Sequence, residues 1–82
     1  MTDKDEVYLK ILLGPNGLQR IAAVMTNPLR LQLKELHGIE MNKEHEYIVE
    51  AAVLTEKPAT YRDAVILQDR LLKQIVDAAE RR

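Results

Sequence analysis

ATYRDAVILQDRLLKQIVDAAERR, residues 59–82, is the longest uninterrupted helical pattern in the chain. Pro58 marks its upstream boundary, because proline does not continue a preceding helix. Thr60 is followed three residues later by Asp63, which provides an N-cap hydroxyl and an acidic partner for the first turn. We therefore predict a helix that begins at Tyr61 and continues through the rest of this stretch.

The apolar residues of this predicted helix form two neighbouring stripes when they are placed at about 100° per residue. The first stripe contains Ala64, Leu67, Leu71, Ile75 and Ala78, and the second contains Val65, Leu72, Val76 and Ala79. Together they cover roughly half of the helix surface, which is more than one neighbouring helix can cover. The opposite side alternates in charge at a spacing that predicts a solvated face, through Asp69, Lys73, Asp77 and Arg81.

Two residues of the helix depart from this division. Gln68 lies near the centre of the apolar arc, where a buried amide would need a hydrogen bond across a helix pair or across the seam of a homodimer. We favour the alternative, a rim position in contact with water between two neighbouring helices. Ile66 lies on the charged side, where a single exposed Ile is normal and also fits a contact with a partner.

Length and composition limit the size of the core. A chain of 82 residues forms one domain, residues 1–82, because a chain this short cannot support two cores. Hydrophobic residues make up 46% and charged residues 30%, with no Phe, no Trp and three Tyr. The interior is therefore filled by Leu, Ile, Val and Ala, which suits close helix packing. Little material is left to cover a half-cylinder of apolar surface.

Charge and hydropathy narrow the environment and the partners. Twelve basic and thirteen acidic residues give a net charge of −1, so no global positive field attracts nucleic acid or an anionic membrane. No apolar run has the length of a membrane span, and the first residues are acidic where a secretory signal is basic. The chain has no Cys, which removes disulfides and thiolate chemistry. We expect a cytoplasmic protein without a membrane partner.

The rest of the chain is predicted to form short helices separated by Gly and Pro signals. We expect helices over residues 7–13, 17–25, 28–37 and 43–56, with a break at Asn27-Pro28, where Pro fits the first position of a new helix. The result is an all-α fold, a compact bundle of four to five short helices packed on the long C-terminal helix. The alternative is an α+β fold with an N-terminal β-hairpin, in which Val7–Leu13 pairs with Leu18–Met25 across Gly14-Pro15-Asn16-Gly17.

Motifs of catalysis and of cofactor binding do not occur in this sequence. The chain has neither Ser nor Cys as a nucleophile, and its three Gly residues do not form a phosphate-binding loop. A polar cluster around His37 and His45 has the ligand types for a metal, but neither His has a Glu three residues before it. We therefore expect no enzyme activity, no cofactor and no metal site.

A nucleic-acid function is the alternative that the sequence leaves open. Residues 17–37 have helix-turn-helix proportions, and their basic residues that could contact phosphates are Arg20, Arg30 and Lys34. The run from Ala23 to Leu33 resembles the first-helix segment of ArsR-type winged-helix repressors. That resemblance implies a DNA-binding regulator, but the basic wing and the polar recognition helix of that family have no counterpart here, and we do not assign the chain to it.

The wide apolar arc of the C-terminal helix is the strongest functional indication in the sequence. A non-enzymatic module for protein–protein interaction or assembly best fits it, and self-association as a homo-oligomer fits the lack of covering material. Small regulators, assembly proteins and accessory subunits all fit this description. The predicted interaction surface consists of Val65, Ile66, Gln68, Leu72, Val76 and Ala79.

Overall fold

The computed structural model describes residues 3–81, which form four α-helices and no strand. The helices are α1 (Asp3–Leu13), α2 (Gly17–His37), α3 (Lys43–Glu56) and α4 (Tyr61–Glu80). The all-α prediction is confirmed, and α3 has the predicted bounds. The β-hairpin alternative is wrong, because both of its segments are helical. Acidic residues in the first turn favour α1, and helical periodicity on α2 buries Ile21, Ala22 and Met25 on one side.

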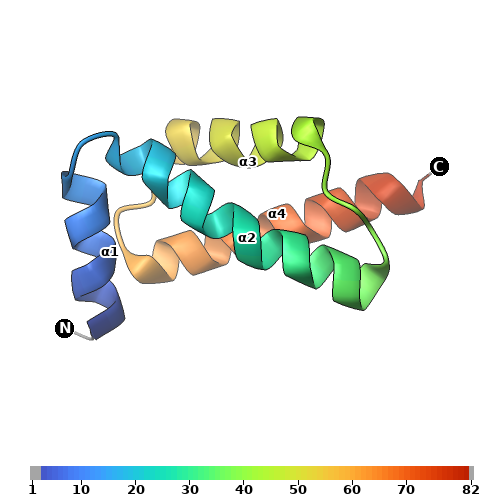
Figure 1. Cartoon of the computed structure of the whole chain (residues 1–82), viewed down its shortest axis with the longest axis horizontal. Coiled ribbons are helices and arrows are strands. Elements are labelled where there is room, and N and C mark those ends of the chain that lie inside the picture. The colour runs from blue at the N-terminus through green and yellow to red at the C-terminus, as the bar shows by residue number, and fades with distance from the viewer. Residues whose placement is uncertain (1–2, 82) are drawn as a thin grey trace.

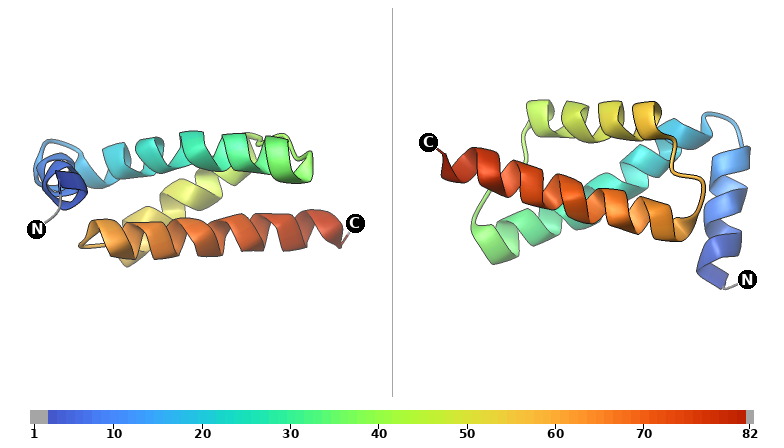
Figure 2. Two further views of the ribbon diagram at one scale, coloured as in Figure 1. Left: turned by 90° about the horizontal axis from the view of Figure 1, so that it is seen from below. Right: turned by 180° about the vertical axis from the view of Figure 1, so that it is seen from behind.

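Three of the helices run along the long axis of the molecule, and α1 closes one end of it (Figure 1). α2 and α4 run in the same direction and cross each other, while α3 returns in the opposite direction beside them. α1 is nearly perpendicular to the other three and lies next to the first turns of α2 and α4 (Figure 2). The molecule measures 40 × 22 × 16 Å, so it is thin and every helix keeps an exposed side.

The predicted break at Asn27-Pro28 is wrong, because α2 continues through Pro28. Proline has a backbone angle that suits a helix, but it removes the N–H that would bond to the Val24 carbonyl and its ring crowds that carbonyl. The hydroxyl of Thr26 donates to the Ala22 carbonyl at 2.8 Å. The buried residues before and after the proline lie on the same side of α2; they are Ile21, Met25, Leu29 and Leu33. One continuous helix buries all four on the same side, which outweighs the lost hydrogen bond.

Local chemistry explains the starts of α3 and α4 and the end of α2. The Thr60 hydroxyl accepts from the Asp63 N–H at 3.1 Å, so α4 begins at Tyr61 as expected. Asn42 caps α3 in a reciprocal pair with His45, whose N–H donates to Asn42 Oδ1 at 2.9 Å. α2 ends at Gly38, where φ is 64°, a conformation that favours glycine.

A close approach between backbones fixes the corner between α1 and α2. A Cβ atom on Gly17 would lie 2.0 Å from the carbonyl oxygen of Leu12, so only glycine fits at the first position of α2. The last turn of α1 therefore packs directly on the start of α2. This contact holds α1 across the end of the bundle.

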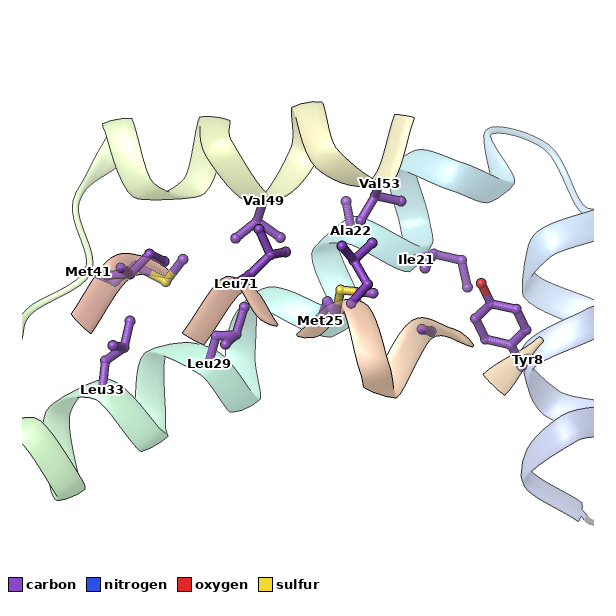
Figure 3. Close-up of a cluster of buried hydrophobic side chains, with 13 residues drawn as sticks. Tyr8, Ile21, Ala22, Met25, Leu29, Leu33, Met41, Val49, Val53 and Leu71 are labelled. Atoms are coloured by element: carbon purple, nitrogen blue, oxygen red, sulfur yellow. The ribbon is translucent and has the colours of Figure 1, made fainter. Parts of the chain in front are cut away.

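The core runs along α2 and receives side chains from all four helices (Figure 3). Its buried members are Tyr8, Ile21, Ala22, Met25, Leu29, Leu33, Met41, Val49, Val53, Ala64, Leu67, Leu71 and Ile75. Four of the five residues of the predicted first stripe of α4 are buried, and Ala78 is exposed. The prediction that the bundle packs on the C-terminal helix is only roughly met, because α2 also contacts every other helix and is one residue longer than α4.

Candidate interaction groove

An open groove of about 400 Å³ lies where α1, α2 and α4 meet. Its walls come from three segments far apart in the chain: α1, the first half of α2 and the first turns of α4. The lining is mostly apolar and consists of Asp3, Lys4, Val7, Tyr8, Ile11, Ile21, Val24, Met25, Pro28, Tyr61, Ala64, Val65 and Gln68. We refer to it as the α1/α2/α4 groove.

Each of the three helices that line the groove contributes one exposed valine. Val7 on α1, Val24 on α2 and Val65 on α4 expose 57%, 58% and 41% of their surface. Single exposed aliphatic residues are common, but three of them around one hollow form a contiguous apolar patch. The apolar row of α2 continues beyond the groove, because Leu31 follows Val24 by seven residues, two helical turns, and exposes 56%.

Gln68 contributes a polar amide to this mostly apolar groove. Its Nε2 donates to the Met25 carbonyl at 3.2 Å, which links α4 to α2 where they approach each other. The side chain is half-buried and lines the open groove, which is compatible with the preferred expectation of a rim position in contact with water. The hydrogen bond across a helix pair, which the sequence offered as the alternative, forms within the chain. It fixes the register of α4 on α2 at the groove.

Tyr8 joins the end wall of the groove to the rest of the fold. Its hydroxyl donates to the carbonyl of Pro58, in the connection before α4. Burial raises the pKa of the Tyr8 phenol above its ordinary value of 10.0, and the negative charge of Asp63 raises it further. The neutral phenol is therefore the form that the fold prefers, and it holds α1 against the start of α4.

The mouth of the groove carries the charged groups of its lining. The Lys4 ammonium lies 5.7 Å from the centre of the Tyr61 ring, within the range of a cation–π contact. Tyr61 itself exposes 37% of its surface. Asp3, at the first position of α1, also lines the groove. The charges therefore stand on the α1 side, and the α2 and α4 walls are apolar apart from Gln68.

The structure divides the predicted interaction surface into three parts. Val65 and Gln68 line the groove. Leu72 and Val76 are half-buried and pack against the core of this chain, and Ala79 near the end of α4 is also half-buried. Ile66 exposes 57% but lines a different hollow, beside the ion pair between Arg70 and Glu56. The second stripe of α4 is therefore open at its N-terminal half and partly covered beyond it.

Sequence reasoning missed the contributions of α1 and α2 to this surface. Val24 does carry a signal, because it lies outside the row of apolar residues that faces the core of α2. Val7 carries no comparable signal, since it belongs to a short stretch, residues 7–13, that is apolar except for Lys10 and in which no single face stands out.

The structure distributes the predicted phosphate-contacting residues along α2. The helix-turn-helix interpretation of residues 17–37 is wrong in its geometry, because this segment is one continuous helix without a turn. Arg30 pairs with Glu46 of α3 and also donates to the Met41 carbonyl at 3.3 Å. Arg20 and Lys34 are exposed and lie fourteen residues apart, about 20 Å along the helix.

The polar cluster around the two histidines has a structural explanation. His45 Nδ1 accepts from the Asn42 N–H at 3.3 Å, as part of the cap of α3. His37 is exposed in the last turn of α2, where a cation favours the helix dipole. Within residues 3–81, no three His, Asp or Glu side chains are placed to hold a metal ion.

No helix in the described part of the chain combines the length and the apolar character needed to cross a bilayer. Comparison with known proteins gives no further assignment: no protein family model, no characterised protein and no solved structure matches this chain.

Proposed function

We propose that this chain is a non-enzymatic interaction module that assembles with a second copy of itself through the α1/α2/α4 groove. The observation that carries the proposal is the groove itself, an apolar hollow with an exposed valine on each of its three walls. Apolar surface gathered in a concave site gains more from a protein partner than the same residues gain when they are scattered.

The chemistry of the groove supports binding rather than catalysis. Two polar groups of its lining residues, the Gln68 amide and the Tyr8 hydroxyl, already hydrogen-bond to backbone carbonyls of the same chain. Its charged groups, Asp3 and Lys4, stand at the mouth. A general acid or base needs a titratable group within reach of a bound substrate. In this groove the rest of the lining is mostly apolar and includes Val7, Val24 and Val65.

Self-association is supported by what lies next to the groove. A symmetric dimer uses the same surface patch on both subunits, so that patch must contain both a hollow and a projection that fits it. Leu31 projects from α2 two turns beyond Val24, on the same side of the helix. The thin shape of the molecule leaves this surface uncovered by the chain itself.

Val65→Lys tests the proposal, with Ile66→Lys as a matched control. Both residues are exposed aliphatic side chains on the same turn of α4, but only Val65 lines the groove. Sedimentation velocity at micromolar concentration is expected to show dimers for the wild type and for Ile66→Lys, and monomers for Val65→Lys. A buried Lys without a partner strongly disfavours the dimer.

Two results would contradict the proposal. One is a wild-type chain that stays monomeric up to about millimolar concentration, where even weak dimers populate. The other is an equal loss of dimer in both variants, which would locate the contact outside the groove. Circular dichroism of each variant checks that the helices remain intact.

A further inference from the structure

We infer that α2 of the second copy occupies the groove, antiparallel to α2 of the first, with its Leu31 seated between Val24 and Val65. The inference rests on the proposed self-association and adds its geometry and its specificity. It follows from three features of α2: a projection beside the hollow, a row with two-fold symmetry, and charges of opposite sign at the ends of that row.

The first feature is the placement of Leu31. It exposes 56% of its surface and follows Val24 by about 10 Å along the helix. Pro28 lies between the two and lines the groove. A projection and a hollow on one helix, side by side, satisfy the requirement of a two-fold interface, since each copy then fills the hollow of the other.

The second feature is the register of the exposed row. We place the two-fold axis between Asn27 and Pro28. Residues of the two copies then face each other when their numbers add up to 55. Val24 then meets Leu31 of the second copy, and the apolar Pro28 ring lies near the axis. Residues 24, 28, 31 and 35 follow one another at spacings of four and three, so they share one side of the helix.

The third feature is charge. In the same register Arg20 meets Glu35 of the second copy, at both ends of the interface. Both side chains are exposed, and among the described residues neither forms an ion pair within its own chain. A parallel pair of α2 helices would instead place Arg20 against Arg20 and Glu35 against Glu35, which like-charge repulsion disfavours. Charge complementarity therefore favours the antiparallel second copy.

Charge reversal with rescue tests the register. In Arg20→Glu, the new carboxylate meets Glu35 of the second copy at both ends of the interface. In Glu35→Arg, the new guanidinium meets Arg20 of the second copy in the same way. Each single variant is expected to raise the dimer dissociation constant about tenfold at low salt, because two symmetry-related pairs change sign together. The double variant Arg20→Glu/Glu35→Arg restores opposite charges and is expected to return to within about threefold of the wild type. Sedimentation equilibrium measures all four proteins.

Leu31→Asp tests the seated projection, with Leu36→Asp as its control. Leu36 is an exposed leucine on the same helix, with 72% of its surface accessible, and it lies off the row. Leu31→Asp is expected to weaken the dimer by a factor of at least about 100, because two carboxylates would be buried in apolar hollows. Leu36→Asp is expected to leave the dissociation constant within about threefold of the wild type.

The outcomes separate this inference from the proposed function. A wild-type dimer that Val65→Lys disrupts, but that Leu31→Asp leaves intact, would overturn the α2 register and keep the groove as the interface. Single charge reversals that weaken the dimer without rescue in the double variant would also overturn the register. A monomeric wild type would overturn both. The substituted side chains are exposed, and circular dichroism of each variant is the check that it is folded.

Discussion

Tyr8 shows how a single residue positions the groove. It is the only buried hydrophobic side chain that α1 contributes to the core within the described residues, and its hydroxyl reaches the Pro58 carbonyl fifty positions away. α1 would otherwise contact the bundle through the half-buried Ile11 and Leu12. The orientation of the α1 wall, and with it the position of Val7, therefore depends on this aromatic side chain and its hydrogen bond together with the close contact between Leu12 and Gly17.

This dependence predicts an alkaline loss of stability. Because the pKa of Tyr8 is raised in the folded chain, its contribution is complete below the unfolded value near 10 and declines as the pH rises through the folded value. We expect the free energy of unfolding, from urea denaturation, to fall less between about pH 9 and about pH 11 in Tyr8→Phe than in the wild type. Tyr8→Phe also costs about 1 kcal/mol at neutral pH through the lost hydrogen bond.

Tyr47→Phe is the control for this measurement. Tyr47 exposes 72% of its surface, so the substitution leaves the packing of α1 unchanged. We expect this variant to keep the alkaline decline of the wild type. The interpretation fails if both variants lose it equally.

At the scale of helices, α2 combines the core with the exposed row that the dimer proposal uses. One side carries Met25, Leu29 and Leu33 into the core, and the side that carries Leu31 stays exposed. Pro28 lies within α2 and also lines the groove. It leaves the Val24 carbonyl without its helical donor, so α2 is less stable than its packing would allow.

Pro28→Ala is therefore expected to stabilise the monomeric fold. Alanine restores the N–H that bonds to the Val24 carbonyl, and it suits a helix interior better by about 3 kcal/mol. The greater freedom of the unfolded chain offsets up to about 1 kcal/mol of this gain. The expected rise in the free energy of unfolding is about 2 kcal/mol, measured by urea denaturation in the monomeric Val65→Lys background.

Pro15→Ala provides the comparison for Pro28→Ala. Pro15 lies in the corner between α1 and α2, outside any helix, and is exposed. Its replacement restores no helical hydrogen bond, so we expect no increase in stability. A stability gain at Pro15, or a loss at Pro28, would mean that packing of the rings outweighs the backbone effect.

At the scale of the molecule, the proposed self-association through the groove predicts that folding and assembly are coupled. A ligand that binds only the native state stabilises it by mass action, and a second copy acts in the same way. We expect the thermal midpoint of the wild type to rise with protein concentration, by scanning calorimetry across a hundredfold range, about 10 µM to 1 mM. Val65→Lys is expected to unfold at a midpoint independent of concentration. A constant midpoint in the wild type would argue against assembly through the native fold.

Local chemistry determined much of this protein. The start of α4 at Thr60, the bounds of α3 and the buried row from Ala64 to Ile75 all follow from caps and periodicity, because these depend on neighbours within a few residues. The break at Pro28 was inferred from neighbouring residues alone and is wrong, because packing against distant residues keeps α2 continuous.

The sequence by itself determined that the C-terminal stretch is helical, where α3 and α4 begin, and that α4 has more apolar surface than one neighbour covers. Only the tertiary structure decided which part of that surface stays open. The covering of Leu72 and Val76, and the meeting of Val7, Val24 and Val65 around one groove, depend on the angles at which α1, α2 and α4 cross. Those angles arise from contacts between residues far apart in the chain, which periodicity does not encode.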